Sequence, residues 1–311
     1  MTHSRSLTVH PVPSMGAEDV VVGADGTVFT GTEDGAVWAL DPATGSTRRV
    51  ADTGGRPLGI ELLDDDLVVC DAVRGVLRVD PRTGAVEVLV AEVDGEPMRF
   101  CNNAAVAADG TIWFSDSSRH FGVDRWKDDF VQDTRTGRLL RRDPDGTVAV
   151  VLDGLRFSNG VALAADESYV AVAECRGRAV VRLWLAGPRA GERDHLVRDL
   201  PGYPDNISRG SDGLIWVTLA SPTDPVVEGL GSAPLALRRL VTRIPEALQP
   251  RPKQTIRVQA YDDTGGLVHD LDLAQPGSGP GFHMVTGVRE HDGKVWLGSL
   301  HEPSVAVLDR P

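Results

Sequence analysis

Four oxygen-bearing side chains stand at the same distance before a turn that recurs along the chain. The turn is Asp-Gly, as at Asp109-Gly110, or a related acidic pair, and a β-prone run follows each copy. Counting back eight residues from the second turn residue reaches Glu18, Asn102, Asn159 and Asp205 in four copies. The same count gives Leu58 and Val285 in the other two, so the repeat alone does not impose the pattern. If the copies surround an axis, the four side chains converge on one point.

Two carboxylates and two amide oxygens form a hard-oxygen set. Such a set suits calcium better than zinc, because no Cys or paired His joins it. The alternative is that Asn and Asp begin strands by capping turns. Glu is poor at capping turns, and all four residues share one position, so the pattern favours a metal site.

The repeat also predicts the fold that must position these residues. Six copies of the turn occur, and each unit holds three recognisable strands and a fourth before the next copy, such as residues 86–90. Four-stranded units that recur about every forty residues indicate a propeller. We therefore predict an all-β, six-bladed β-propeller with four-stranded antiparallel blades, in which residues 1–311 form a single domain. A strand near the N-terminus should join residues 305–308 and close the ring.

Two intervals between turns are long and predict insertions. Residues 119–136 carry a charged, aromatic segment, which is either a lid or pocket wall or a tolerated surface insertion. The second insertion lies within 221–260, where the stretch between Pro234 and Pro245 has helical spacing.

Composition excludes some classes of function. The net charge of −13 argues against nucleic-acid binding, which needs clustered Lys and Arg. Excess acid suits a central cation, but it is also common in soluble proteins. The odd set of Cys70, Cys101 and Cys175 predicts buried free thiols in a reducing compartment. We find no segment typical of a signal peptide or membrane span, so we expect a cytoplasmic protein without membrane or nucleic-acid partners. The oligomeric state stays open.

Several segments resemble a known superfamily. Residues 136–139, 157–163, 184–187 and 204–207 are similar to the calcium-dependent six-bladed propellers of the gluconolactonase, paraoxonase and diisopropylfluorophosphatase superfamily, and especially to its strictosidine-synthase-like branch. The resemblance implies a calcium site made by the four residues above, with Asn206 as an additional ligand. It also implies that Asp205 acts as general base or nucleophile.

The chain departs from that family at two positions. Asn103 stands where an Asp is common, which removes one carboxylate near the metal. Thr286 stands where plant strictosidine synthases carry the Glu that condenses an amine with an aldehyde. The second departure weakens the condensation hypothesis.

Further candidates come from polar residues near the expected mouth. His283 precedes the last turn by ten residues and is predicted to move protons or orient water, although a structural role fits it equally well. Asn103 and His120 are predicted to bind substrate.

We carry three functional hypotheses. The first is a calcium-dependent hydrolase of small-molecule lactones or esters, with phosphotriesters as a further class. The second is a strictosidine-synthase-like enzyme that catalyses a condensation, cyclisation or rearrangement in secondary metabolism. The third is a non-catalytic propeller that serves as a binding platform.

Overall fold

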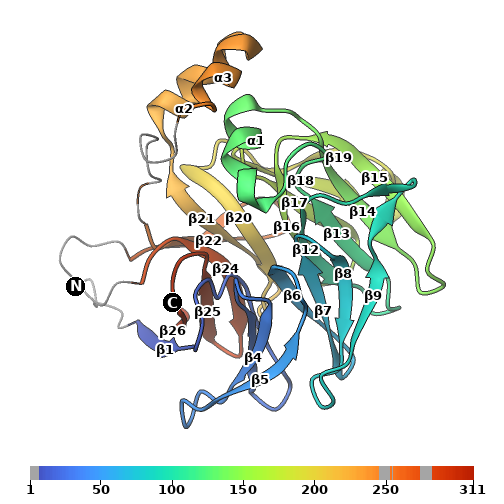
Figure 1. The fold of residues 1–311 in the computed structure, drawn as a ribbon, viewed down its shortest axis with the longest axis vertical. Coiled ribbons are helices and arrows are strands. Elements are labelled where there is room, and N and C mark those ends of the chain that lie inside the picture. The colour runs from blue at the N-terminus through green and yellow to red at the C-terminus, as the bar shows by residue number, and fades with distance from the viewer. Residues whose placement is uncertain (1–6, 245–252, 254, 274–281) are drawn as a thin grey trace.

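The structure is a ring of four-stranded antiparallel sheets. The computed structural model describes residues 7–244, 253, 255–273 and 282–311, which form six such sheets. Figure 1 shows these blades arranged around a common centre. The predicted six-bladed propeller is confirmed.

The blades follow one another along the chain. Blades 1 to 3 contain β2 (Val20–Val22), β3 (Val28–Gly31), β4 (Ala36–Leu40) and β5 (Thr47–Asp52); β6 (Pro57–Leu63), β7 (Asp66–Asp71), β8 (Gly75–Val79) and β9 (Val86–Val90); and β12 (Cys101–Val106), β13 (Ile112–Asp116), β14 (Gly137–Arg142) and β15 (Val148–Leu155). Blades 4 to 6 contain β16 (Ser158–Leu163), β17 (Tyr169–Glu174), β18 (Ala179–Trp184) and β19 (Arg193–Val197); β20 (Gly202–Arg209), β21 (Ile215–Pro222), β22 (Arg257–Tyr261) and β23 (Leu267–Asp272); and β24 (Val285–His291), β25 (Lys294–Ser299), β26 (Ser304–Asp309) and β1 (Thr8–Pro11). A small hairpin of β10 (Glu92–Val93) and β11 (Glu96–Pro97) precedes blade 3.

Blade 6 joins the two ends of the chain. Its outermost strand is β1, which pairs antiparallel with β26 from Thr8 opposite Val307 to Pro11 opposite Ser304. The predicted closure by an N-terminal strand is therefore confirmed.

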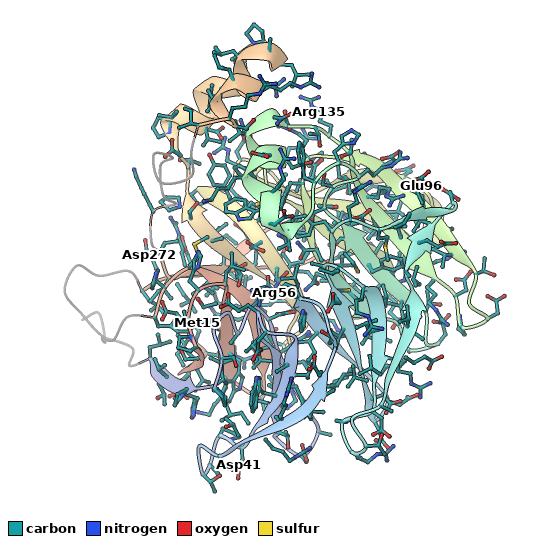
Figure 2. The ribbon with its side chains drawn as sticks, viewed as in Figure 1. Met15, Asp41, Arg56, Glu96, Arg135 and Asp272 are labelled. Carbon is teal, nitrogen blue, oxygen red and sulfur yellow. The ribbon has the colours of Figure 1, made fainter. Side chains whose placement is uncertain are left out.

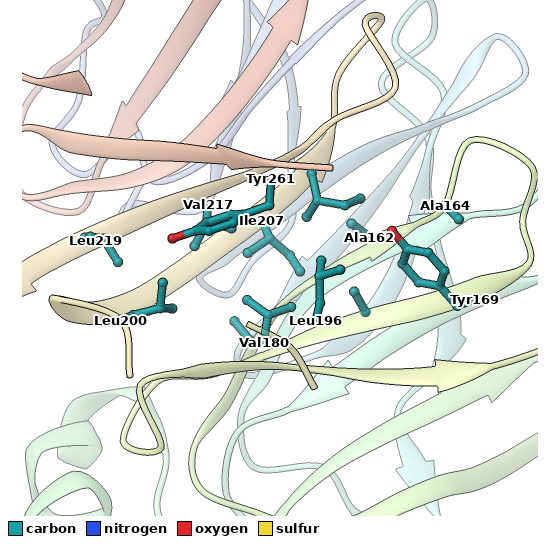
Figure 3. Close-up of a cluster of buried hydrophobic side chains, with 13 residues drawn as sticks. Ala162, Ala164, Tyr169, Val180, Leu196, Leu200, Ile207, Val217, Leu219 and Tyr261 are labelled. Carbon is teal, nitrogen blue, oxygen red and sulfur yellow. The ribbon is translucent and has the colours of Figure 1, made fainter. Parts of the chain in front are cut away.

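The hydrophobic core lies between neighbouring blades. Figure 3 shows the cluster where blade 4 meets blade 5, in which Val180 and Ala162 face Ile207 and Val217. The Tyr169 hydroxyl donates a hydrogen bond of 2.6 Å to Asp263 at the edge of this cluster. The three cysteines are buried free thiols, as predicted.

The two insertions carry the helices. Residues 119–136 contain the 3₁₀ turn η1 (Val123–Arg125) and α1 (Trp126–Gln132), and a second 3₁₀ turn, η2 (Gly187–Arg189), lies in blade 4. The later insertion contains α2 (Pro225–Leu230) and α3 (Leu235–Val241), and Figure 1 shows α1, α2 and α3 gathered at the same edge of the ring. The predicted helix corresponds to α3, although Pro245 lies outside the described residues. Helix α2 was not predicted, yet its start has clear signals: Pro225 at the first turn and Asp224, whose carboxylate caps the N–H groups of Val226 and Val227.

Candidate metal centre and substrate cavity

In five blades irregular pairing of the inner strand accompanies a side chain that reaches a shared cavity, and in blade 1 Glu18 reaches the same cavity from just before β2. Pairing shifts at bulges in the inner strands, for example between Cys101 and Ala104 in β12 and between Pro204 and Ile207 in β20. The cavity measures about 370 Å³. Its floor receives one residue from each blade in turn, namely Glu18, Leu58, Asn102, Asn159, Asp205 and Thr286. The structure thus brings together the four residues found by counting back from the turns.

The count fails in blade 6, where it gives Val285 instead of Thr286. Val106 and Ile112 of blade 3 are joined by a five-residue connection, whereas His291 and Lys294 of blade 6 are joined by two residues. Blade 2 has the same short hairpin between Leu63 and Asp66. In the structure the turn residues of blade 2 are Asp64 and Asp65, one position before the pair used in the count from the sequence. In both tight hairpins the floor position is therefore seven residues before the second turn residue, so the offset follows the length of the loop.

Four buried oxygens at the floor have no hydrogen-bond partner. They are Glu18 Oε2 and the Oδ1 atoms of Asn102, Asn159 and Asn206. The amide nitrogens are already used: Asn102 donates to Ser117 Oγ at 2.9 Å, Asn206 donates to Glu18 Oε1 at 3.2 Å, and Asn159 donates to Asp205. Each amide therefore leaves its carbonyl oxygen unpaired. Because unpaired buried oxygens are costly, this arrangement suits a cation or a hydrogen-bond donor at the floor.

The carboxylates at the floor have strongly perturbed acidities. Burial raises the pKa of Glu18 well above its usual value, and the neighbouring Asp19 and Asp205 add to the rise. Burial also raises the pKa of Asp205 to about 7, while the hydrogen bond from Asn159 opposes the rise. Arg56 partly compensates the charge of Glu18, and Figure 2 shows it near the middle of the ring. A bound cation would favour the ionised form of both carboxyl groups.

The donor set fits calcium. It combines carboxylate and amide oxygens, which calcium prefers. Within the described residues, no group of three or more His, Cys, Asp or Glu could hold a metal, so the site depends on the Asn oxygens. The role of Glu18, Asn102, Asn159, Asp205 and Asn206 as ligands stays a prediction.

The residue after each floor position alternates between a polar side chain and glycine around the ring. Blades 1, 3 and 5 place Asp19, Asn103 and Asn206 there, whereas blades 2, 4 and 6 place Gly59, Gly160 and Gly287. Each glycine lets the next polar residue approach, because a Cβ on Gly59 would lie 2.6 Å from Asn103 Cα, and one on Gly287 would lie 2.7 Å from Asp19 Cα.

Asn103 is a link between blades and does not line the substrate cavity. Its Nδ2 donates to Asp19 Oδ2 at 3.0 Å, and its Oδ1 accepts from the backbone N–H of Val161 at 2.9 Å. Asp19 Oδ2 also accepts from the backbone N–H of Ile60 at 3.1 Å. Both ends of the Asn103 amide are therefore used in the ring, and its substrate-binding role stays a prediction.

The predicted histidines do not line the cavity. His120 is exposed at the end of β13, where its N–H donates to Ser118, and its predicted role in binding substrate has no support in the geometry. His283 Nδ1 contacts Glu302 Oε1. His301, which was not predicted from the sequence, does line the cavity. Burial is the main cause that lowers the pKa of His301, and the nearby His283 lowers it further.

The upper wall of the cavity was also missed. The residues two positions before the floor positions line it in five blades: Arg56, Phe100, Phe157, Tyr203 and Met284. Since side chains alternate along a strand, a second count of two residues would have found them. Residues of η1 and α1 complete the wall, so the interpretation of residues 119–136 as a pocket wall is confirmed.

The chain belongs to the family described as the SMP-30/gluconolactonase/LRE-like region, whose model matches residues 24–226. Protein STRICTOSIDINE SYNTHASE-LIKE 10 of Arabidopsis thaliana is 34% identical over 270 residues, which cover 82% of this chain and 70% of that protein. The adipocyte plasma membrane-associated protein of Rattus norvegicus is 32% identical over 319 residues, covering 94% of this chain and 83% of the relative. The superfamily and branch inferred from the motifs are thereby confirmed.

Solved structures share the fold at low identity. A gluconolactonase of Xanthomonas campestris has a TM-score of 0.70 at 17% identity, covering 99% of this chain and 91% of its own. The calcium-binding protein regucalcin of Agrobacterium tumefaciens has a TM-score of 0.65 at 14% identity, with coverages of 96% and 90%.

None of the described helices is both long and apolar enough to span a membrane. The cytoplasmic location stays a prediction.

Proposed function

We propose that this protein is a calcium-dependent hydrolase of small-molecule lactones or esters, with phosphotriesters as a further substrate class. The observation that carries the proposal is the set of unpaired oxygens and raised-pKa carboxyls at the floor of a cavity with apolar walls. Glu18, Asn102, Asn159, Asp205 and Asn206 would hold the ion. When bound, calcium supplies a Lewis acid that polarises a carbonyl or phosphoryl oxygen.

The protein's own residues would then position the reacting groups and accept or transfer protons. Asp205 reaches the cavity and is held by the amide of Asn159, so it is the candidate general base or nucleophile. His301 lines the same cavity, and His283 lies near it with Glu302 as partner. A proton-transfer role for His283 would therefore pass through His301.

The first experiment measures bound calcium in the purified protein and its melting temperature before chelation, after chelation and after calcium is returned. At a calcium concentration a hundred times the Kd, binding adds about 2.7 kcal/mol, which corresponds to a rise of about 4 °C for a chain of this size. Lactone and ester hydrolysis is followed in the same samples.

Variants separate the site from general effects of charge. Asp205→Asn should abolish hydrolysis, and Glu18→Gln should abolish the calcium response. Asp65→Asn is the matched control, because its carboxylate is exposed and distant from the floor. The proposal fails if the wild type hydrolyses its substrates equally well with chelator present, or if it neither binds calcium nor cleaves any member of the panel.

A condensation, cyclisation or rearrangement is the second candidate, because the relatives include strictosidine-synthase-like proteins. Thr286 weighs against its simplest form, since this floor residue has no carboxylate and its hydroxyl donates to Glu18 O at 2.8 Å. Incubation with amine and aldehyde pairs tests it by the appearance of a coupled product. A protein that binds these small molecules without converting any of them would instead be a binding platform.

A further inference from the structure

The cavity above the candidate metal site has two chemically different sides. Blades 3, 4 and 5 line one side with Phe100, Phe157 and Tyr203. Blades 2 and 6 line the other side with Arg56 and Met284, and Glu33 and His301 lie nearby in the same cavity. This asymmetry bears on which part of a substrate faces which wall.

The aromatic side is packed as a rigid unit. The ring centroids of Phe100 and Phe157 are 5.5 Å apart, those of Phe130 and Phe157 are 5.9 Å apart, and those of Phe130 and Tyr203 are 4.9 Å apart. The ring planes meet at 80–87°, which is the favourable edge-to-face arrangement. These four side chains are at most 7% exposed, so they form a surface that needs little rearrangement on binding.

The helices extend this apolar surface over the cavity. Trp126 of α1 stacks edge-on against Phe130 at 6.2 Å, and Val227 of α2 packs against the same cluster. Val123 of η1 joins them. The wall therefore combines residues of two insertions with residues of blades 3, 4 and 5, which meet only in the folded protein.

The polar groups beside this wall bind one another. The Tyr203 hydroxyl donates to Glu228 Oε1 at 2.9 Å, and Arg176 donates to the same oxygen at 2.9 Å and to Val227 O at 2.9 Å. The carboxylate of Asp224 caps α2. These groups are already paired with one another, so a ligand hydroxyl placed against the aromatic rings would lose hydrogen bonds to water and gain none from the rings.

We infer that the substrate is a lactone or ester with a bulky apolar substituent, an alkyl chain or an aromatic ring, which occupies the aromatic side while the carbonyl points to the floor. This inference rests on the proposed function and adds the substrate class. A polyhydroxylated sugar lactone does not match this wall. The cavity volume of about 370 Å³ lies in the range of small-molecule sites.

Binding of lactams tests the substrate class without any turnover. The probes are five-membered lactams with side chains from methyl to decyl, and a polyhydroxylated lactam, each titrated into the calcium-loaded protein by calorimetry. Burying a methylene contributes about 0.8 kcal/mol, so affinity should rise up to about fourfold for each methylene until the side chain fills the cavity. The polyhydroxylated probe should bind more weakly than the methyl probe.

Nearly isosteric variants locate the binding surface. Val123→Thr and Val227→Thr place a hydroxyl on the wall and should weaken binding of the decyl probe about fivefold, while leaving the methyl probe unchanged. Val148→Thr is the matched control, because Val148 is a half-buried residue on an outer strand away from the cavity. Trp126→Ala provides a larger change at a partly exposed position.

The outcomes separate the two proposals. Affinity that rises with chain length and falls in the wall variants supports the apolar substrate class, even if no lactone is hydrolysed and the proposed function fails. Affinity independent of chain length, tighter binding of the polyhydroxylated probe, or equal losses in Val148→Thr would overturn the inference. Hydrolysis of sugar lactones with no turnover of alkyl lactones would also overturn it, while leaving the calcium-dependent hydrolase standing.

Discussion

At the scale of single residues, Glu18, Asp19 and Asp205 concentrate negative charge where water is largely excluded. Burial raises the pKa of Asp19 to about 6, and Arg289 opposes the rise. Arg289 is itself paired with Glu61 at 2.7 Å, and both side chains are mostly buried. Arg289 thus neutralises part of the charge beneath the floor, and Arg56 compensates only part of the charge of Glu18.

The raised pKa values predict that calcium stabilises the protein more at neutral than at acidic pH. The pKa of Asp205 is about 7 when folded and about 3.8 when unfolded, so the folded, calcium-free protein holds the proton more tightly. The contribution of protonated Asp205 to the stability of the calcium-free protein is therefore lost as pH rises from about 4 to about 7. Calcium must displace those protons, so its stabilising effect should grow over the same range.

Melting curves with calcium and with chelator at pH 5 and pH 7.5 check this prediction. Calorimetric titration at pH 6 in two buffers of different ionisation enthalpy should also show proton release on binding. Asp205→Asn should flatten the pH dependence. An equal calcium-induced shift at both pH values would contradict the prediction.

Asn103 provides a second test at this scale. Asn103→Ala removes one of the two hydrogen bonds to Asp19 Oδ2, leaving the one from Ile60, and leaves the buried N–H of Val161 without its partner. We expect a loss of about 2–4 kcal/mol in the free energy of unfolding. Denaturant unfolding measures this loss, and the KM of the folded fraction should change little. A raised KM with unchanged stability would instead support the predicted role of Asn103 in substrate binding.

At the scale of elements, the bulged inner strand is the unit that builds the site. The turn chemistry and the β-prone runs in the sequence were sufficient to predict the blades and most of the floor. They could not separate Asn102 from Asn103, because a bulge changes which of two adjacent side chains faces the cavity. His301 and the wall of α2 were missed for a different reason: they reach the cavity from loops and insertions, where no strand periodicity applies.

The alternation of polar residues and glycines around the ring predicts that a methyl group added at one of these glycines strongly lowers stability. A Cβ at Gly160 would lie 2.0 Å from the backbone nitrogen of Ile207, so blades 4 and 5 would have to separate. Gly160→Ala should lower the free energy of unfolding by about 2 kcal/mol or more, and it should weaken calcium binding because Asn159 and Asn206 move apart.

Gly229→Ala is the matched control for this prediction. Gly229 lies in α2, where an added Cβ would meet no other atom within 4 Å, and alanine is the better helix former. Its stability should be unchanged or slightly higher. Thermal melts of the two variants would refute the packing argument if Gly160→Ala proved as stable as Gly229→Ala.

At the scale of the whole molecule, the ring depends on the pairing of β1 with β26. Without β1, blade 6 would have three strands, and β26 would present unpaired N–H and C=O groups. The half-buried Val9 of β1 also packs against the core of blade 6. Since Glu18 follows β1 and faces Asn206 of blade 5, loosening this closure should reach the floor of the cavity.

Removal of residues 1–11 should therefore lower both stability and calcium affinity. We expect the melting temperature to fall by about 5 °C or more, as for a loss of about 3 kcal/mol, and the exposed edge should promote self-association. Thr8→Ala, at an exposed position of the same strand, should have little effect. Melting curves and light scattering measure the two changes, and calcium titration reports on the floor. If the shortened chain melts like the full chain and binds calcium equally well, closure by β1 does not support the site, and the position of Glu18 must be held by blade 1 alone.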